Sequence, residues 1–249
     1  MKKKYKALIL DLDGTTIPNR RYGLPSKKVI DAIMKAHEKV FVCIATGRPL
    51  HQALPILAAL QIKNPVILLG GSQIIEGSSK DFIYERPFLL DDVITLLPML
   101  KPYHNQIVID EKTDKIEYFV GYKPKEVFNL LIRNLSEKTA DEIINTISPI
   151  KTITAHKIIS WEAGEVVVNI SHAEATKQHA IYEVAKLLRI DTHEIIGVGD
   201  GYNDFPLLMA CGLKVAMGNA VPELKSIADY IAPTVEEDGV ADVIEKFIL

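Results

Sequence analysis

The chain has 249 residues, of which 29 are Lys or Arg and 32 are Asp or Glu, and 48% of its residues are hydrophobic. Such a composition is typical of a globular protein and excludes a disordered chain, which would be poor in hydrophobic residues. The net charge of −3 lacks the basic excess of a protein that binds the phosphate backbone, so we expect no nucleic acid partner. The length favours two modest domains.

The cysteines and apolar runs indicate where the protein works. Cys43 and Cys211 lie far apart in apolar stretches, which is typical of buried reduced thiols. The apolar run after Tyr5 is too short for a signal peptide, and no run reaches the roughly 18 residues of a membrane helix. We therefore expect a cytoplasmic protein without a membrane partner, as a monomer or a small homo-oligomer.

The first third of the chain alternates apolar runs, which predict strands, with amphipathic segments, which predict helices. We expect strands at Ala7–Leu10, Val40–Ala45 and Val66–Leu69, and helices after the capping residue Ser26 and over Leu50–Leu60. Alternation of this kind is typical of a parallel sheet that is covered on both faces.

The pattern changes at about residue 82 and returns after residue 172. Between these positions we expect helices at Leu90–Leu100, Glu126–Leu135 and Ala140–Thr146, and strands at Ile107–Asp110, Ile116–Val120, Thr152–Ser160 and Val166–Ile170. After them we expect helix Lys177–Leu188, strand Ile195–Val198, helix Asp204–Ala210, strand Leu213–Ala216, a short helix near Glu223 and helix Val240–Ile248. We therefore predict an α/β fold: a doubly wound parallel-sheet core of residues 1–81 and 173–249, interrupted by an inserted α+β domain at 82–172.

Two aspartates follow the first predicted strand. In an extended chain the side chains of Asp11 and Asp13 point the same way, which places two carboxylates at the carboxyl end of the strand, where parallel sheets bind ligands. Gly14 then allows a turn at little steric cost. Taken alone, the segment is explained equally well as a structural Asp-rich turn.

A hydroxyl, a glycine and a helix start follow the second strand, at Thr46, Gly47, Arg48 and Pro49. Backbone N–H groups at the helix start and the Thr46 hydroxyl would together bind an anion. A purely structural turn explains such a segment more often. Arg48 could pair with a phosphate or lie on the surface.

The strand expected at Ile195–Val198 is followed by Asp200, Asn203 and Asp204. Four acidic residues from two strand ends would repel each other strongly unless a cation lay among them. Oxygen ligands of this kind suit Mg²⁺, which retains water and binds substrate phosphates. Lys177, at the start of a core helix, is either a solvated surface residue or a positive charge for a phosphoryl group.

Four short motifs, in this order, resemble those of the haloacid dehalogenase (HAD) superfamily and most closely its Cof-type hydrolases. The motifs are Asp-Leu-Asp-Gly-Thr at 11–15, Ala-Thr-Gly-Arg-Pro at 45–49, Ala-Thr-Lys at 175–177 and Gly-Asp-Gly-Tyr-Asn-Asp at 199–204. The resemblance implies a Rossmann-like core with a cap inserted between the second and third motifs. Gly70-Gly71-Ser72 departs from the Asn-Gly-Ala that relatives often carry after the third strand.

The resemblance also implies the chemistry of a Mg²⁺-dependent phosphatase that forms an aspartyl-phosphate. It makes Asp11 the nucleophile and Asp13 the group that protonates the leaving oxygen and later activates water. It assigns Mg²⁺ to Asp11, the Asp13 carbonyl and Asp200. It assigns the phosphoryl group to Thr46, Gly47, Lys177 and Asn203, with Asp204 orienting Lys177 or metal-bound water.

We therefore predict a hydrolase of small phosphorylated metabolites such as sugar phosphates, with the inserted cap selecting the substrate. The alternatives are a phosphomutase on the same core and a non-catalytic sensor of phosphorylated metabolites. The presence of both Asp11 and Asp13 disfavours the sensor. Mutase and hydrolase would differ in cap closure and water exclusion.

Overall fold

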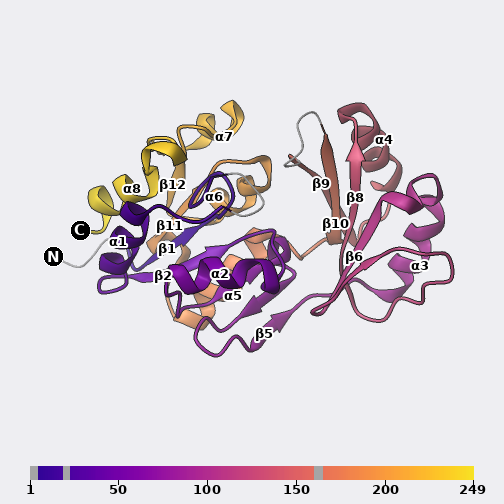
Figure 1. Cartoon of the computed structure of the whole chain (residues 1–249), viewed down its shortest axis with the longest axis horizontal. Coiled ribbons are helices and arrows are strands. Elements are labelled where there is room, and N and C mark those ends of the chain that lie inside the picture. The colour runs from indigo at the N-terminus through magenta and orange to yellow at the C-terminus, as the bar shows by residue number, and fades with distance from the viewer. Residues whose placement is uncertain (1–4, 19–22, 160–164) are drawn as a thin grey trace. The chain divides into compact units, whose positions relative to one another are not determined.

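The computed structural model describes residues 5–18, 23–159 and 165–249. It divides into two compact units, Met1–Tyr84 with Lys177–Leu249, which we call the core unit, and Glu85–Thr176, which we call the insert. Each unit has its own sheet (Figure 1) and its own hydrophobic core. Ser160, which the sequence analysis assigns to a strand, lies outside the described residues.

The core unit is built on a sheet with the order β13-β12-β11-β1-β2-β3-β4-β5. Its strands are β1 (Ala7–Leu10), β2 (Phe41–Ala45), β3 (Val66–Leu68), β4 (Gln73–Ile75), β5 (Phe82–Glu85), β11 (Ile195–Gly199), β12 (Leu213–Ala216) and β13 (Tyr230–Ile231). The central strand β1 is parallel to both neighbours, because Ala7 pairs with Ile195 on β11 and with Phe41 on β2. All four residues of β1 are buried, as expected for an apolar strand in the middle of a covered sheet.

Helices cover both faces of this sheet. They are α1 (Lys27–Ala36), α2 (Leu50–Ala59), α5 (Lys177–Leu188), α6 (Phe205–Ala210), α7 (Pro222–Ile227) and α8 (Gly239–Phe247). From β1, the chain adds β2 and β3 successively toward one edge of the sheet. From β11, it adds β12 and β13 toward the other edge. Because such crossovers are right-handed, α1 and α2 cover one face, and α6 and α7 cover the other. The sheet is therefore doubly wound, and its order reverses between β1 and β11, where ligands bind in such folds.

The start of α1 follows from its cap. The Ser26 hydroxyl oxygen accepts a hydrogen bond from the backbone N–H of Val29 at 3.1 Å, which satisfies a helix-end donor. The same hydroxyl donates to Asp238 Oδ1 at 2.5 Å, directly before α8. Since α1 and α8 also pack together, Ser26 joins two parts of the chain that are far apart in sequence.

One edge of the core sheet is antiparallel. Strand β4 runs antiparallel to β3, and β5 lies next to β4. Leu69 and Gly70 reverse the chain between β3 and β4 with positive φ angles of 49° and 69°. Neither β4 nor β5 is predicted from sequence, because no α-helix separates β3, β4 and β5 and the alternation of strands with helices stops at β3. The insert is predicted to start at residue 82, but this residue is the first of β5, which belongs to the core sheet.

The insert is an antiparallel sheet with helices on one face. Its strands, in the order β7-β6-β8-β10-β9, are β6 (Ile107–Glu111), β7 (Lys115–Glu117), β8 (Val127–Leu135), β9 (Ile153–Ile159) and β10 (Val166–His172). Its helices are α3 (Leu90–Met99) and α4 (Glu137–Ile147). Side chains from one sheet face, including Ile109, Leu130 and Ile170, form a buried core with residues of both helices.

The helix expected over residues 126–135 is wrong, because this segment forms β8, the central strand of the insert. An apolar run of this length fits a buried strand and a buried helix equally well by periodicity. Its neighbours β6 and β10 supply the hydrogen bonds that make it a strand. The helix begins only after Ser136, whose hydroxyl oxygen accepts from the backbone N–H of Thr139 at 3.1 Å.

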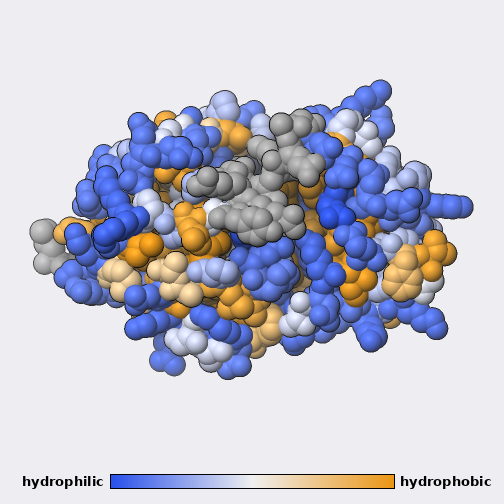
Figure 2. Space-filling view, in the orientation of Figure 1, coloured by the Kyte–Doolittle hydropathy of each residue, from blue (hydrophilic) through white to orange (hydrophobic). Residues whose placement is uncertain are grey.

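Hydrophobic residues on the visible surface lie in small groups among hydrophilic ones (Figure 2). Among the described residues, we find no helix with the length and apolar character needed to cross a membrane.

Candidate functional site

The carboxyl ends of β1 and β11 bring two motif aspartates together. Asp11 directly follows β1, and its backbone N–H donates to the Val198 carbonyl of β11 at 3.0 Å. Asp200 directly follows β11, and its Oδ1 accepts from the Thr15 hydroxyl at 2.8 Å. The loops after β1 and β11 are therefore joined at the point where the strand order reverses.

Lys177 lies at the centre of the carboxylates. Its Nζ donates to Asp11 Oδ1 and to Asp204 Oδ1, both at 2.6 Å. Only 2% of its side chain is exposed, so it is an interior group and not a solvated surface residue. The first residue of α5 thus places its ammonium group between the ends of two loops.

Asp204 is fully engaged by hydrogen bonds. Its Oδ1 accepts from Lys177, and its Oδ2 accepts from the backbone N–H groups of Asp200 and Gly201, both at 2.9 Å. Asp204 therefore orients Lys177 and the loop after β11. This leaves Asp11 and Asp200 as the carboxylates better suited to hold a cation.

The electrostatics of this cluster favour a bound cation. Carboxylate oxygens of Asp11, Asp200 and Asp204 lie within 4.8 Å of one another. Burial raises the pKa of Asp11 well above its usual value, and the Asp204 charge adds to this effect. Burial and then Asp204 raise the pKa of Asp200 to about 7. Burial would lower the pKa of Lys177, but Asp11 and Asp204 more than offset that effect and raise it.

Three carboxylates and one ammonium leave an excess of two negative charges when all are ionised. A buried excess of this kind is costly unless a counter-charge is present. The oxygen donors and the charge both fit a divalent metal ion. The cluster could therefore hold a metal, with Asp11 and Asp200 supplying carboxylate oxygens.

The turn after β1 requires a glycine. Gly14 has a φ of +83°, and a Cβ on it would lie 2.2 Å from Asp200 Oδ2. The Asn219 amide donates to the Gly14 carbonyl at 2.8 Å, and the Thr16 hydroxyl donates to the Asp11 carbonyl at 2.5 Å. The turn is thus fixed from several sides and lets Asp200 approach the backbone closely.

Asp13 points to a different partner from Asp11. Arg48 Nε donates to Asp13 Oδ2 at 2.8 Å, and Arg48 Nη2 donates to Oδ1 at 2.5 Å. Because the Asp13 carboxylate is paired in this way, only its backbone carbonyl fits the role of metal ligand that the resemblance assigns. Arg48, for which the sequence allows either a phosphate contact or a surface position, is buried.

The remaining predicted site residues lie on two loops. Thr46 is buried, and its hydroxyl oxygen accepts from the Arg48 N–H at 3.1 Å, which leaves the hydroxyl hydrogen for another acceptor. Gly47 is exposed, with open space beside its Cα. Asn203 is half-buried, and its amide oxygen lies over Gly201.

Several residues that shape the site gave no sequence signal of their own. Thr15 is the last residue of the first motif, and Thr16 follows it. Their hydroxyls donate to Asp200 and to the Asp11 carbonyl, and their position beside the motif is the signal that could have indicated these contacts. Asn219 lies far from every motif in sequence, and only the fold brings it to Gly14.

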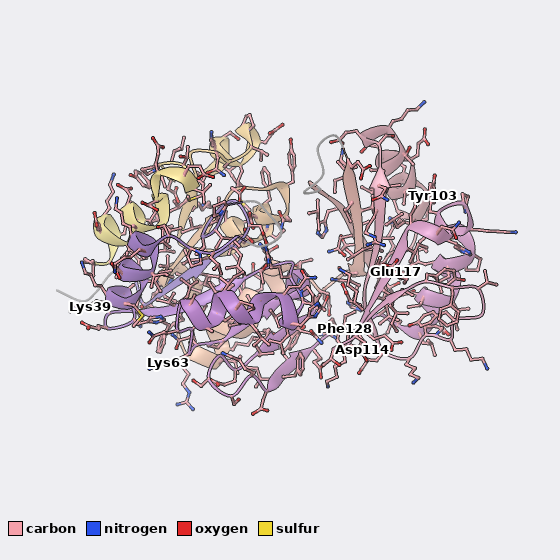
Figure 3. All side chains as sticks on the ribbon, in the orientation of Figure 1. Lys39, Lys63, Tyr103, Asp114, Glu117 and Phe128 are labelled. Atoms are coloured by element: carbon pink, nitrogen blue, oxygen red, sulfur yellow. The ribbon has the colours of Figure 1, made fainter. Side chains whose placement is uncertain are left out.

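A second polar cluster lies on the insert. Asp110 pairs with Asn129 across β6 and β8, and Asn169 pairs with Leu131 across β8 and β10, so these residues share the sheet face opposite the helices. All three polar side chains are buried, and Asn169 Oδ1 has no hydrogen-bond partner among the described residues. Phe128, which precedes Asn129 and is labelled in Figure 3, is also fully buried. We call Asp110, Asn129 and Asn169 the insert cluster.

Comparison with known proteins identifies the family. The family model of haloacid dehalogenase-like hydrolases matches residues 8–118 and 109–244, and the chain belongs to this family. The chain is 27% identical over 246 residues to the 5-amino-6-(5-phospho-D-ribitylamino)uracil phosphatase YcsE of Bacillus subtilis, an alignment covering 98% of this chain and 96% of that protein. It is therefore a haloacid dehalogenase-like hydrolase, and its relative YcsE is a phosphatase.

Solved structures share the fold. A haloacid dehalogenase-like hydrolase from B. subtilis superposes with a TM-score of 0.84 at 22% identity, covering 98% of this chain and 100% of the other. A sugar phosphatase of HAD subclass IIB superposes with a TM-score of 0.80 at 22% identity, covering 97% of this chain and 98% of the other. Both comparisons agree with a doubly wound α/β core that carries an inserted α+β domain.

Proposed function

We propose that this hydrolase is a Mg²⁺-dependent phosphatase of small phosphorylated metabolites such as sugar phosphates, and that it works through an aspartyl-phosphate. The observation that carries the proposal is the group formed by the buried Asp11, Asp204 and Lys177 with the half-buried Asp200. A carboxylate nucleophile, a fixed ammonium and a site for a divalent cation are what phosphoryl transfer requires, because its catalysis depends on positioning and charge stabilisation.

In the first step an Asp11 oxygen attacks phosphorus, an O–P bond forms, and the bond from phosphorus to the leaving oxygen breaks. Asp13 gives its proton to that oxygen, so an alcohol leaves. In the second step Asp13 takes a proton from water as the water attacks phosphorus, and Asp11 is released with inorganic phosphate. Splitting one displacement into two in this way lowers each barrier.

The other residues hold the group that moves. Lys177, kept in place by Asp204, faces the oxygen of Asp11 that it already contacts and would balance charge on the phosphoryl oxygens. Thr46 would donate its free hydroxyl hydrogen to a phosphoryl oxygen, beside Gly47 and Asn203. Mg²⁺, held by Asp11, the Asp13 carbonyl and Asp200, would neutralise the negative charge of the phosphate.

The insert supplies the groups that we propose select the substrate. The insert cluster offers carboxylate and amide groups that hydrogen-bond to hydroxyls, as found along a sugar or a sugar alcohol. The name of the similar YcsE protein records a phosphorylated ribityl chain, which agrees with such a substrate class.

The test is phosphate release from a panel of phosphate monoesters with and without Mg²⁺. We expect Mg²⁺-dependent release of inorganic phosphate, fastest with sugar or sugar-alcohol phosphates. Transfer of the phosphoryl group to a second substrate molecule in place of water would indicate a mutase. Binding of the esters without turnover by metal-loaded protein would contradict the catalytic proposal and favour a sensor.

A further inference from the structure

Arg48 holds Asp13 by both carboxylate oxygens. The two hydrogen bonds, at 2.8 and 2.5 Å, run from different nitrogens of one guanidinium to different oxygens. Only 6% of the Arg48 side chain is exposed, compared with 24% for Asp13. A two-point contact of this kind fixes the plane of the carboxylate as well as its position, which the single ammonium group of a lysine would not do.

Arg48 is in turn held by the backbone around it. Its N–H donates to the Thr46 hydroxyl oxygen, and its carbonyl accepts from the Leu69 N–H at 3.2 Å. The Gly70 N–H donates to the Thr46 carbonyl at 3.0 Å, and the buried Ser72 hydroxyl donates to the Leu69 carbonyl at 3.2 Å. The loop that reverses the chain after β3 therefore braces the segment that carries Arg48.

We propose that Arg48 is a positioning residue for Asp13, which keeps the carboxylate aimed through both proton transfers. This inference rests on the proposed function, because Arg48 can position Asp13 for proton transfer only if Asp13 is the general acid and base. When Asp13 is protonated, one of its oxygens carries the O–H group and becomes a poorer acceptor for the guanidinium. Arg48 would then hold mainly the other oxygen, which leaves the O–H group to donate to the leaving oxygen.

The proposal predicts an effect that depends on the leaving group. Phenyl phosphate needs a proton on its leaving oxygen, whereas 2,4-dinitrophenyl phosphate releases a stable anion and needs none. In single-turnover measurements with Mg²⁺, we expect Arg48→Ala to slow transfer from phenyl phosphate on the order of 10²-fold, within the range for loss of general acid catalysis. Transfer from 2,4-dinitrophenyl phosphate should change by less than about threefold, because only binding and charge matter there.

A double-mutant cycle separates positioning from a structural role. Asp13→Asn should give the same dependence on the leaving group, and adding Arg48→Ala to it should have little further effect, since both remove one function. Arg48→Lys keeps the charge without the two-point contact and should lie between wild type and Arg48→Ala; it also provides the test if Arg48→Ala does not fold. Added guanidinium chloride at millimolar concentration should partly restore Arg48→Ala.

Arg133→Ala is the matched control, because Arg133 also contacts both oxygens of a carboxylate, that of Glu117, but on the exposed surface of the insert. It should change neither rate. Equal slowing with both esters in the Arg48 variants, or full additivity with Asp13→Asn, would overturn the positioning role. Failure of the wild type to accept phosphate from either ester would instead reject the proposed function.

Discussion

The core unit and the insert use buried polar residues in opposite ways. In the core unit, both oxygens of Asp204 and both oxygens of Asp13 accept hydrogen bonds from fixed donors, and Lys177 contacts two carboxylates. In the insert, the amide oxygen of Asn169 is buried without a partner among the described residues. The core unit holds its polar groups in place with hydrogen bonds before any substrate binds, whereas the insert retains an acceptor that has no partner yet.

This difference follows from the tasks that we propose for the two units. Groups that stabilise a transition state act best when the fold holds them in place before the reaction. Groups that recognise a ligand must exchange their partners for it, and a buried oxygen without a partner gains most from a ligand hydroxyl. The five predictions below test the comparison, beginning with the largest expected effect.

Replacement of Asp11 by Asn should abolish phosphatase turnover, by on the order of 10⁴-fold or more, because it removes the nucleophile. Beryllofluoride, which stands in for the phosphoryl group, should bind wild type in the presence of Mg²⁺ and fail to bind the variant. The variant should still fold. Turnover near that of wild type, after mass spectrometry has excluded deamidation back to Asp, would remove Asp11 from this role.

Replacement of Lys177 by Met should affect the fold as well as the chemistry. It leaves Asp11, Asp200 and Asp204 without their cation, and breaking a buried ion pair costs about 3–5 kcal/mol of unfolding free energy. Urea unfolding should show this loss at pH 7 and a smaller one at pH 5, where protonation of the carboxylates relieves the repulsion. An equal loss at both pH values would show that packing, and not charge, explains the effect.

Removal of metal should make stability depend on pH in one direction. The pKa of Asp200 is raised to about 7 in the folded protein from an ordinary value of 3.8. Between these values the folded state binds the proton more tightly than the unfolded state, so stability falls as the pH rises from about 4 to 7. In EDTA we expect the melting temperature to fall over this interval, and millimolar Mg²⁺ to restore it at pH 7. A melting temperature in EDTA that stays level or rises would contradict the argument.

Replacement of Asn169 by Leu should change substrate ranking without harming the fold. Loss of one hydrogen bond to a substrate hydroxyl should cost roughly 10- to 100-fold in kcat/KM for the best ester, corresponding to about 1–3 kcal/mol. Beryllofluoride binding should be unchanged, and the melting temperature should be equal or higher, because a buried amide oxygen without a partner is removed. Asn145→Leu, on the exposed surface of α4, is the control. Unchanged ranking in Asn169→Leu would show that this residue does not select.

The smallest expected effects compare two helix caps. Ser26→Ala in the core unit and Ser136→Ala in the insert should each lower the free energy of unfolding by about 1 kcal/mol. Ser26→Ala should cost more, because the second hydrogen bond of Ser26 is to the Asp238 carboxylate and joins α1 to α8, whereas that of Ser136 is to the Thr139 hydroxyl of its own helix. Urea unfolding of the two variants measures the difference. A larger loss for Ser136→Ala would show that the Asp238 contact contributes no stability.

Sequence predicts the architecture well where strands alternate with helices. The predicted strand at Ala7–Leu10 and the predicted helix over Lys177–Leu188 have the observed bounds of β1 and α5. The doubly wound core and the HAD family are confirmed. The segment at 126–135 was assigned to the wrong class, because hydrogen bonds from β6 and β10 decide its structure and a single segment does not contain that information.

In the site, too, sequence predicts some features and not others. The parallel sheet places Asp11 and Asp200 at one edge, which motif positions alone were enough to anticipate. The pairing of Arg48 with Asp13 depends on side-chain directions that no spacing encodes. The insert cluster is assembled by cross-strand register between segments far apart in sequence, and no motif marks it.

The place of β1 between β2 and β11 has a consequence for the order of events during synthesis. Ala7 pairs with Ile195, so the strand that Asp11 directly follows obtains one of its two neighbours only after the whole insert has left the ribosome. At about 5–20 residues per second, the intervening chain takes roughly 10–40 s to make. All strands of the insert sheet are contiguous in sequence between residues 107 and 172. The insert can therefore complete its sheet on the ribosome before β11, Asp200 and Asp204 follow it, so the unit proposed to recognise the substrate forms before the unit that acts on it.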